Sequence, residues 1–358
     1  MTATEKLRNA GQSLWLDNIT RDLLTSGTLK RYIDTLSITG LTSNPTIFDH
    51  AISKSAAYDQ DIRAMAKSGV PREDLFFRLA IADLQQAADL FRPIHDRTAG
   101  VDGWVSLEVS PLLAYDTQRT VEAASSLHAA AARPNLFIKI PGTKQGVPAI
   151  EEATFRGVPI NVTLLFSREQ YIAAAEAYMR GLERRIASGL SLDVRSVASL
   201  FVSRWDKATM DKLPDNLRDR LGIAVAQSTY AAYRDLLDSE RWQRLENWGA
   251  HTQRLLFAST GTKDPRAPDT LYIGALAAPN TINTMPEETL SHFADHGEVG
   301  SVLPRDGGVA SETLSAIVRA GVDPDRLAAD LQTEGAKSFD ESWSDLLKAI
   351  ETKSHALV

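Results

Sequence analysis

The chain has 358 residues, of which 43% are hydrophobic and 24% are charged, as is usual for a globular protein with a large core. It contains no cysteine, which excludes disulfides, thiol nucleophiles and cysteine-ligated metal centres. The net charge of −7 argues against general nucleic-acid binding, so an anionic ligand needs a local cluster of donors. The N-terminal segment has no apolar leader and no stretch reaches roughly 18 apolar residues, so we expect a cytoplasmic protein without a membrane span.

Short runs rich in β-branched and aromatic residues alternate with long, alanine-rich segments of helical spacing. The short runs predict strands at residues 13–19, 38–45, 104–110, 135–142, 159–167, 196–204, 254–260 and 279–286. Helices are expected between them, and further helices follow from about residue 304. This alternation is typical of parallel βα units and predicts a single domain over residues 1–358, a closed (β/α)8 barrel of the TIM type. A doubly wound open sheet is the alternative.

The predicted strands carry polar side chains on one face, near the end of each strand. Successive side chains of a strand point to opposite faces. In residues 135–142, Ile138 and Ile140 share one face and Lys139 stands on the other. The polar or ionisable residues near strand ends are Asp17, Asn44, Glu108, Lys139, Asn161 and Thr163. In a barrel the polar face is the interior, and active sites form at its carboxyl end.

The run at residues 159–167 follows the same rule. Strict alternation places Ile160, Val162, Leu164 and Phe166 on the helix-facing side, opposite Asn161, Thr163, Leu165 and Ser167. We therefore expect Leu164 and Phe166 to pack against helices, and Thr163 to point into the barrel.

A lysine and two carboxylates inside a barrel are costly unless they are paired or functional, so a structural ion pair is one interpretation. The functional interpretation starts from Lys139. An ammonium among apolar groups loses its hydration, which makes the free amine available to attack a ketone or aldehyde and form a Schiff base. Glu108 and Thr163 suit the accompanying proton transfers, and Asp17 suits removal of a hydroxyl proton during carbon–carbon cleavage. This chemistry needs no metal.

The segments WLDN, LTSNPTIF, LEVSPLLAYDT, IKIPGT, INVTLLFS and SLFVSRWD contain these residues. Together they resemble the transaldolase family of the pentose phosphate pathway, from about residue 5 to about residue 350. The resemblance implies a class I aldolase barrel that uses a Schiff-base lysine and no cofactor. It also implies reversible transfer of a dihydroxyacetone unit from sedoheptulose 7-phosphate or fructose 6-phosphate to glyceraldehyde 3-phosphate or erythrose 4-phosphate.

The resemblance implies a catalytic role for four residues. Lys139 of IKIPGT resembles the Schiff-base lysine, and Asp17 of WLDN resembles the base of carbon–carbon cleavage. Glu108 of LEVS and Thr163 of NVTLL resemble the pair that handles the catalytic water. Lys144, in the loop that follows, is a weaker candidate for the nucleophile because a loop ammonium stays hydrated.

The resemblance also implies a set of binding residues. Asn44 of TSNP and Asn161 of INVT resemble ligands of the dihydroxyacetone part, with Thr42 beside them. The remaining set comprises the phosphate contacts Ser199, Arg204 and Ser259, the wall residue Phe201, and Lys263 of STGTKDP, which stands where better-known relatives have an arginine. A lysine offers a point charge instead of a bidentate fork, so phosphate affinity is expected to differ.

Two other functions remain open at this point. A fructose-6-phosphate aldolase would release free dihydroxyacetone, but such relatives are shorter and typically carry a tyrosine where Glu108 stands. A sugar-phosphate-binding barrel without turnover is the second alternative, although Lys139 is present. His292 and His296 are one helical turn apart but lack a recognised metal motif, so no metal site is expected. The chain is expected to be a monomer or a homodimer.

Overall fold

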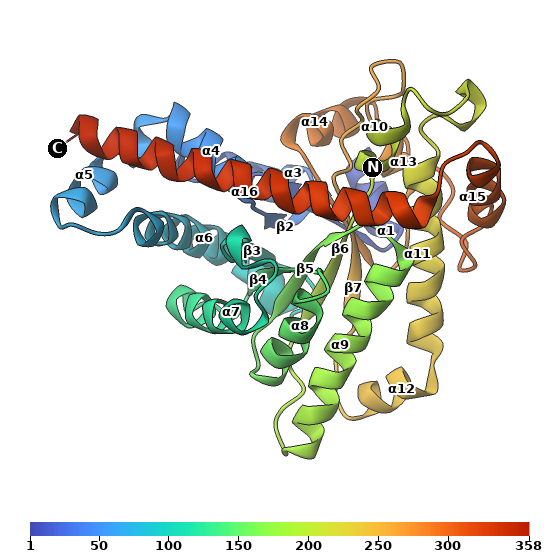
Figure 1. Cartoon of the computed structure of the whole chain (residues 1–358), viewed down its shortest axis with the longest axis horizontal. Coiled ribbons are helices and arrows are strands. Elements are labelled where there is room, and N and C mark those ends of the chain that lie inside the picture. The colour runs from blue at the N-terminus through green and yellow to red at the C-terminus, as the bar shows by residue number, and fades with distance from the viewer. Residues whose placement is uncertain (358) are drawn as a thin grey trace.

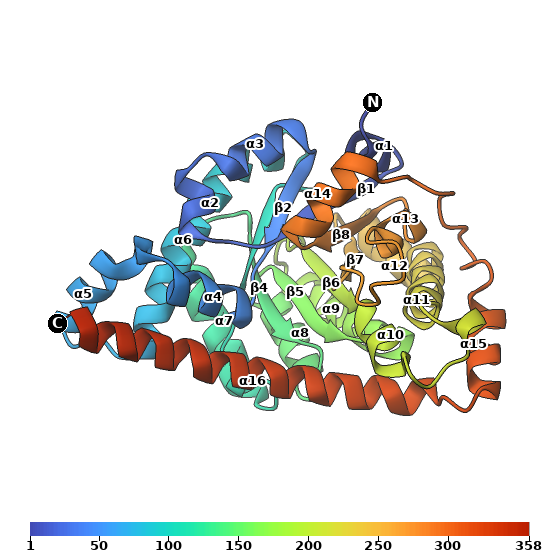
Figure 2. The same ribbon diagram turned by 90° about the horizontal axis from the view of Figure 1, so that it is seen from above.

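The computed structural model describes residues 1–357, and within them eight parallel strands close into a barrel in chain order, β1 pairing with both β2 and β8 (Figures 1 and 2). The strands are β1 (Gln12–Asp17), β2 (Ile38–Thr42), β3 (Trp104–Glu108), β4 (Leu136–Pro141), β5 (Ile160–Leu165), β6 (Ser196–Phe201), β7 (Gln253–Ala258) and β8 (Thr281–Met285). The predicted (β/α)8 barrel is therefore confirmed, and the open doubly wound sheet is excluded.

Helices surround the strands and connect them. They are α1 (Ala3–Asn9), α2 (Arg21–Thr25), α3 (Thr28–Thr35), α4 (Pro45–Lys54), α5 (Asp59–Lys67), α6 (Arg72–Arg97), α7 (Thr117–Ala131), α8 (Gly146–Phe155), α9 (Arg168–Ala187), α10 (Ser203–Thr209), α11 (Leu221–Asp238), α12 (Glu240–Asn247), α13 (Leu271–Ala275), α14 (Glu287–His296), α15 (Ala310–Arg319) and α16 (Pro324–Leu357). Short 3-10 helices lie at Ala56–Tyr58, Pro111–Leu113 and Asp215–Leu217. None of the helices in residues 1–357 is long and apolar enough to cross a bilayer.

Aromatic side chains fill the amino-terminal half of the barrel interior. The rings of Trp104 and Phe137 stack with centroids 4.0 Å apart, and Trp15 tilts against Phe137 at 6.3 Å. Gly40 leaves the room that this packing needs, because a Cβ there would lie 2.6 Å from the Trp15 ring. This aromatic plug of Trp15, Trp104 and Phe137 separates the amino-terminal end of the barrel from the carboxyl ends of the strands, where active sites of such barrels form.

Strand β5 departs from strict alternation, which corrects one expectation. Leu164 has a φ of 58°, and the pairing of β5 with β6 shifts register between Val162 and Leu165. From Leu164 onward the side chains lie on the sides opposite to those expected. Leu164 and Phe166 pack with the interior aromatic residues, and Leu165 packs with the helix-facing layer. Thr163 precedes the shift and points into the barrel as expected.

Asp206 is a buried carboxyl that joins α10 to α11. It accepts the backbone N–H groups of Leu221 (3.0 Å) and Gly222 (3.2 Å) and the hydroxyl of Tyr272 (2.9 Å). A Cβ on Gly222 would lie 2.7 Å from the carboxylate, so glycine is required for this close approach. Burial raises the pKa of Asp206 to about 6, although the N–H donors oppose the shift.

Replacing Asp206 with asparagine is expected to flatten the pH dependence of stability. Because the folded-state pKa of Asp206 lies above its unfolded value, its contribution to stability is present at low pH and is lost as pH rises through about 6. The wild-type free energy of unfolding should therefore lose up to roughly 3 kcal/mol from this group between about pH 4 and pH 6. Urea unfolding at a series of pH values measures it.

Asparagine keeps an acceptor for the two backbone N–H groups and a polar group for Tyr272, so the fold should persist. The surface variant Asp34→Asn, whose carboxylate pairs with exposed Lys30, serves as the control. Equal pH slopes in Asp206→Asn and wild type would contradict this assignment.

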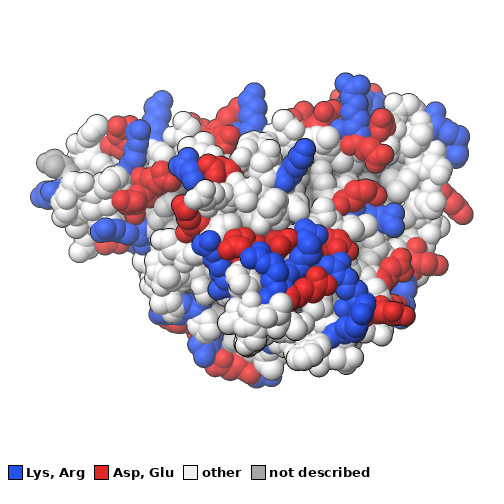
Figure 3. All heavy atoms as spheres, turned by 60° about the horizontal axis from the view of Figure 1, so that its bottom comes forward, with Lys and Arg blue, Asp and Glu red and all other residues white. Residues whose placement is uncertain are grey.

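Acidic and basic side chains are interspersed on the side where α8, α9 and α12 lie (Figure 3). Arg184 contacts Glu151 (3.3 Å) and Glu152 (2.8 Å), and Arg241 of α12 contacts Glu183 of α9 (2.6 Å). Exposed pairs of this kind contribute at most about 1 kcal/mol each. Their main consequence is that the arginines here are locally neutralised.

Candidate active site

A pocket of about 140 Å³ opens at the carboxyl ends of the strands. The residues expected from the sequence that line it are Asp17, Thr42, Asn44, Lys139, Thr163, Ser199, Phe201, Arg204, Ser259 and Lys263. Glu108 and Asn161 lie next to this set, in contact with Lys139 and Ser199 respectively. The structure therefore gathers the predicted site residues in one place, although they come from strands β1 to β6 and from segments that follow β2, β6 and β7.

Lys139 and Glu108 form a buried ion pair. They are paired residues on neighbouring strands β4 and β3, and Lys139 Nζ lies 3.0 Å from Glu108 Oε2. The ammonium also donates to the carbonyl of Ser43 at 2.9 Å. Burial raises the pKa of Glu108, while the charge of Lys139 opposes that rise. The pair thus places an amine beside a carboxyl that readily accepts a proton.

Asp17 is the last residue of β1 and lines the pocket. Its Oδ1 accepts the hydroxyl of Thr42 at 2.7 Å, and Thr42 is also 2.8 Å from the hydroxyl of Thr284. Burial raises the pKa of Asp17, and the Lys139 charge and the Thr42 hydrogen bond act in the opposite direction. Thr284 was missed from the sequence, although alternation along the predicted strand at 279–286 places it at the same mouth.

Two amides occupy different depths of the site. Asn44 caps α4, because its Oδ1 accepts the N–H of Ile47 at 3.0 Å, and its side chain lines the pocket. Asn161 is fully buried, donates to Ser106 at 3.1 Å and accepts the Ser199 hydroxyl at 2.7 Å. The hydroxyl of Ser199 is therefore engaged inside the barrel, and its contact with a phosphate stays a prediction.

Thr163 stands beside this amide pair on β5. Its side chain is fully buried and lines the pocket, and its hydroxyl has no hydrogen-bond partner within residues 1–357. A buried hydroxyl without a partner is costly, so this oxygen is suited to bind a water or a substrate atom.

Two cations stand at the rim of the pocket. The guanidinium of Arg204 lies 5.9 Å from the centre of the Phe201 ring, and burial lowers the pKa of Arg204. Lys263 reaches the surface of the protein. The part of its side chain that is covered, together with the positive charges of Arg204 and Lys207, lowers the pKa of Lys263. Within residues 1–357, neither Arg204 nor Lys263 has a carboxylate partner within 4 Å. An anionic group would be favoured between them.

The C-terminal helix α16 lies beside the pocket, which the sequence did not reveal. Figure 1 shows α16 running along the width of the molecule from α15 to the C-terminus. Gln332 donates to the carbonyls of Gly142 (3.0 Å) and Leu164 (2.9 Å), and Phe339 lines the pocket. Gly335 lets the helix approach, since a Cβ there would lie 3.0 Å from Leu164. The helix therefore supplies an aromatic wall to the site.

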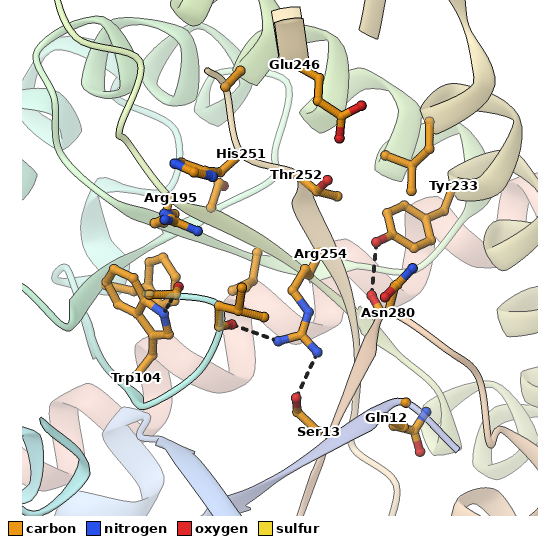
Figure 4. Close-up of a pocket in the computed structure, with 18 of the residues that line it drawn as sticks. Gln12, Ser13, Trp104, Arg195, Tyr233, Glu246, His251, Thr252, Arg254 and Asn280 are labelled. Atoms are coloured by element: carbon orange, nitrogen blue, oxygen red, sulfur yellow. Dashed lines mark hydrogen bonds between the residues drawn. The ribbon is translucent and has the colours of Figure 1, made fainter. Parts of the chain in front are cut away.

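A larger cavity of about 410 Å³ lies at the opposite, amino-terminal end of the barrel (Figure 4). Two of the arginines that line it, Arg195 and Arg254, are already engaged. Arg254 donates to the carbonyl of Val101 (3.0 Å) and the hydroxyl of Ser13 (2.8 Å), and Arg195 pairs with Asp193 (3.1 Å). The aromatic plug separates it from Lys139. We therefore place the candidate active site in the smaller pocket.

Comparison with known proteins identifies the family of this chain. The family described as Transaldolase/Fructose-6-phosphate aldolase matches residues 14–350. A transaldolase of Parafrankia sp. (strain EAN1pec) is 44% identical over 353 residues, which cover 96% of this chain and 96% of the relative. A transaldolase of Kocuria rhizophila is 45% identical over 359 residues, with 98% and 97% covered. Transaldolase 2 of Streptomyces coelicolor is 42% identical over 361 residues, with 98% and 97% covered. The chain belongs to the transaldolase/fructose-6-phosphate aldolase family.

Proposed function

We propose that this chain is a transaldolase that transfers a dihydroxyacetone unit from sedoheptulose 7-phosphate or fructose 6-phosphate to glyceraldehyde 3-phosphate or erythrose 4-phosphate. The observation that carries the proposal is the buried amine of Lys139, 3.0 Å from the carboxyl of Glu108 at the end of the barrel where the pocket opens. An amine in this setting suits imine formation with a ketose carbonyl.

The first step forms the Schiff base. Lys139 passes a proton to Glu108, and the neutral amine attacks the ketose carbonyl carbon to give a carbinolamine. Glu108 then returns a proton to the departing hydroxyl, which leaves as water, and the imine remains. The unpartnered hydroxyl of Thr163 supports this role because it can hold that water next to the reacting carbon.

The second step breaks the carbon–carbon bond. Asp17 removes the proton from the hydroxyl on the carbon that becomes the aldehyde, and the bonding electrons move into the protonated imine to give an enamine. The aldose phosphate leaves, the acceptor aldose enters, and the same steps run in reverse. Burial raises the pKa of Asp17, which suits a base that must accept a proton. Water finally hydrolyses the imine and frees Lys139.

Substrate binding is assigned along the length of the pocket. Asn44, Asn161 and Thr42 are proposed to hold the hydroxyls of the dihydroxyacetone part, which lies near Lys139. The phosphate is assigned to the rim, with Arg204, Ser259 and Lys263 as its contacts. Ser199, whose hydroxyl donates to Asn161, and Phe201, as a wall of the pocket, complete the residues assigned to the phosphate end. The paired rim cations support this orientation.

Trapping with borohydride tests the proposal. The protein is incubated with fructose 6-phosphate, reduced, digested and analysed by mass spectrometry. A reduced dihydroxyacetone adduct on Lys139, together with sedoheptulose 7-phosphate formation when erythrose 4-phosphate is added, is the expected result. Free dihydroxyacetone without transfer would favour the fructose-6-phosphate aldolase alternative, and binding without any adduct would favour a non-catalytic barrel.

Replacing Lys263 with alanine is expected to raise KM for fructose 6-phosphate by about 10-fold with a smaller change in kcat. Because the pKa of Lys263 is lowered, its charge is lost as pH rises, so KM in the wild type should increase on the alkaline side. Lys263→Arg keeps the charge and should remove that increase. Lys144→Ala changes an exposed lysine outside the pocket and serves as the control. An unchanged KM in Lys263→Ala would contradict the phosphate assignment.

Location and assembly stay predictions. We expect the protein to act in the cytoplasm, where its sugar-phosphate substrates are soluble metabolites. A single chain carries every proposed site residue, so a monomer suffices for the chemistry, and a homodimer is the other expected state. Light scattering coupled to gel filtration distinguishes the two.

A further inference from the structure

A second, very small cavity lies behind Glu108. Its volume is about 10 Å³, close to the lower limit for holding one water molecule. Glu108, Asn44 and Phe76 line it, and the C-terminal helix α16 contributes Trp343. Glu108 lines this cavity and not the substrate pocket, so the catalytic carboxyl separates the small cavity from Lys139.

Two of the residues that line the cavity, Glu108 and Trp343, each carry a buried polar atom without a partner. The indole nitrogen of Trp343 and Oε1 of Glu108 are buried and make no hydrogen bond within residues 1–357. The two side chains are 2% and 5% exposed, so bulk water does not solvate them. An indole N–H can only donate and an ionised carboxylate can only accept, and leaving either unsatisfied is costly.

Two phenylalanine rings pack against Trp343 beside the small cavity. The Trp343 ring packs perpendicular to that of Phe76 with centroids 5.0 Å apart and tilts against Phe77 at 5.6 Å. Phe339, four residues earlier on the same helix face, lines the substrate pocket. One face of α16 thus reaches both the substrate pocket and the cavity behind the catalytic carboxyl.

We propose that the small cavity binds one water molecule, which accepts a hydrogen bond from Trp343 Nε1 and donates one to Glu108 Oε1, and that Trp343 is thereby a positioning residue for Glu108. The catalytic part of this inference, the positioning of Glu108 for imine formation, rests on the proposed function. The water would hold Oε1 turned away from the substrate and keep Oε2 directed at Lys139. It would also favour the ionised form of Glu108, because a donor to a carboxylate stabilises the charge.

The test replaces the donor and keeps the ring. In Trp343→Phe the aromatic packing remains but the N–H is lost, so the charged form of Glu108 loses its support. The titration midpoint of Glu108, followed by the ¹³C signal of its carboxyl carbon, is expected to rise by about one pH unit. The rate of imine formation at a pH well below both midpoints should fall by about 10-fold, with KM for fructose 6-phosphate nearly unchanged.

Phe76→Leu is the matched control. Phe76 lines the same cavity and packs on Trp343 but carries no polar atom, so this variant should lower the melting temperature without moving the Glu108 midpoint. If Trp343→Phe folds poorly, 3-benzothienylalanine at position 343 alone replaces the N–H with sulfur in the same ring shape and should give the same shift.

The outcomes separate this inference from the proposed function. A Glu108 midpoint that is identical in wild type and Trp343→Phe, or that moves equally in Phe76→Leu, overturns the inference. The carboxyl titration does not depend on turnover, so it decides the matter even if the wild-type protein forms no adduct on Lys139. Absence of that adduct would instead overturn the proposed function.

Discussion

Replacing Lys139 with methionine is expected to lower kcat for dihydroxyacetone transfer by at least ~10³-fold. Methionine has a similar length and removes the nitrogen that would form the imine. The other lysine of the pocket, Lys263, stands at the rim and is assigned to the phosphate, so it does not replace the lost amine. A coupled assay for erythrose 4-phosphate conversion, combined with borohydride trapping, measures the loss.

The variant also leaves Glu108 without its cation. Burial already raises the pKa of Glu108, so its carboxyl is expected to take up a proton and stay buried as a neutral acid. The melting temperature should fall while the far-ultraviolet circular dichroism spectrum is retained. This pair of measurements separates lost chemistry from lost structure.

Lys144→Met is the matched control for the nucleophile. Lys144 lies five positions further along the chain, and it is exposed where Lys139 is buried. Its replacement should leave both the adduct and the rate unchanged. A reduced adduct that persists in Lys139→Met, on Lys144 or on any other lysine, would show that the nucleophile lies elsewhere.

Outside the end of β5, the sequence predicted the side of the strand on which the site residues lie, but it did not predict the register between strands. Alternation along residues 104–110 and 135–142 places Glu108 and Lys139 inside the barrel. Their direct pairing across β3 and β4 depends on how the strands align, which a period of two residues does not determine. The ion pair was one of two interpretations of these residues, and the structure shows that Lys139 pairs with Glu108 and also lines the pocket.

The deviation in β5 had no local signal. Leucine at a positive φ is unusual, and nothing in residues 159–167 marks Leu164 for it. The carbonyl of Leu164 accepts a hydrogen bond from Gln332 of α16, so a contact from a distant part of the chain accompanies the unusual conformation. Phe339 and Trp343 were missed for the same reason, because helical periodicity identifies the buried face of α16 but not what that face covers.

Replacing Asp17 with asparagine is expected to stop the reaction after imine formation. Asparagine keeps an acceptor for the Thr42 hydroxyl, which is 2.7 Å from Asp17 Oδ1, but its amide cannot take up a proton. We expect kcat to fall by about 10² to 10⁴-fold, the usual range for loss of a general base. The imine itself should still form, because Lys139 and Glu108 are unchanged.

The mass of the trapped adduct is the decisive measurement for Asp17→Asn. With fructose 6-phosphate, borohydride should fix the intact six-carbon sugar phosphate on Lys139, whereas the wild type should give a mixture that includes the three-carbon unit. Accumulation of the three-carbon adduct at the wild-type rate would assign the cleavage base to another residue. Loss of every adduct would mean that Asp17 is needed for binding or imine formation instead.

The pH dependence of kcat gives a second test of the role of Asp17. Because burial raises the pKa of Asp17, wild-type cleavage should weaken as pH falls through that raised value and the base becomes protonated. Thr42→Val removes a hydrogen bond that opposes the rise, so the acid limb of kcat should move to higher pH. Asp17→Asn should lack the limb altogether in its residual cleavage rate. A limb that remains in Asp17→Asn belongs to a different group, and Glu108 would then be the remaining carboxyl to test.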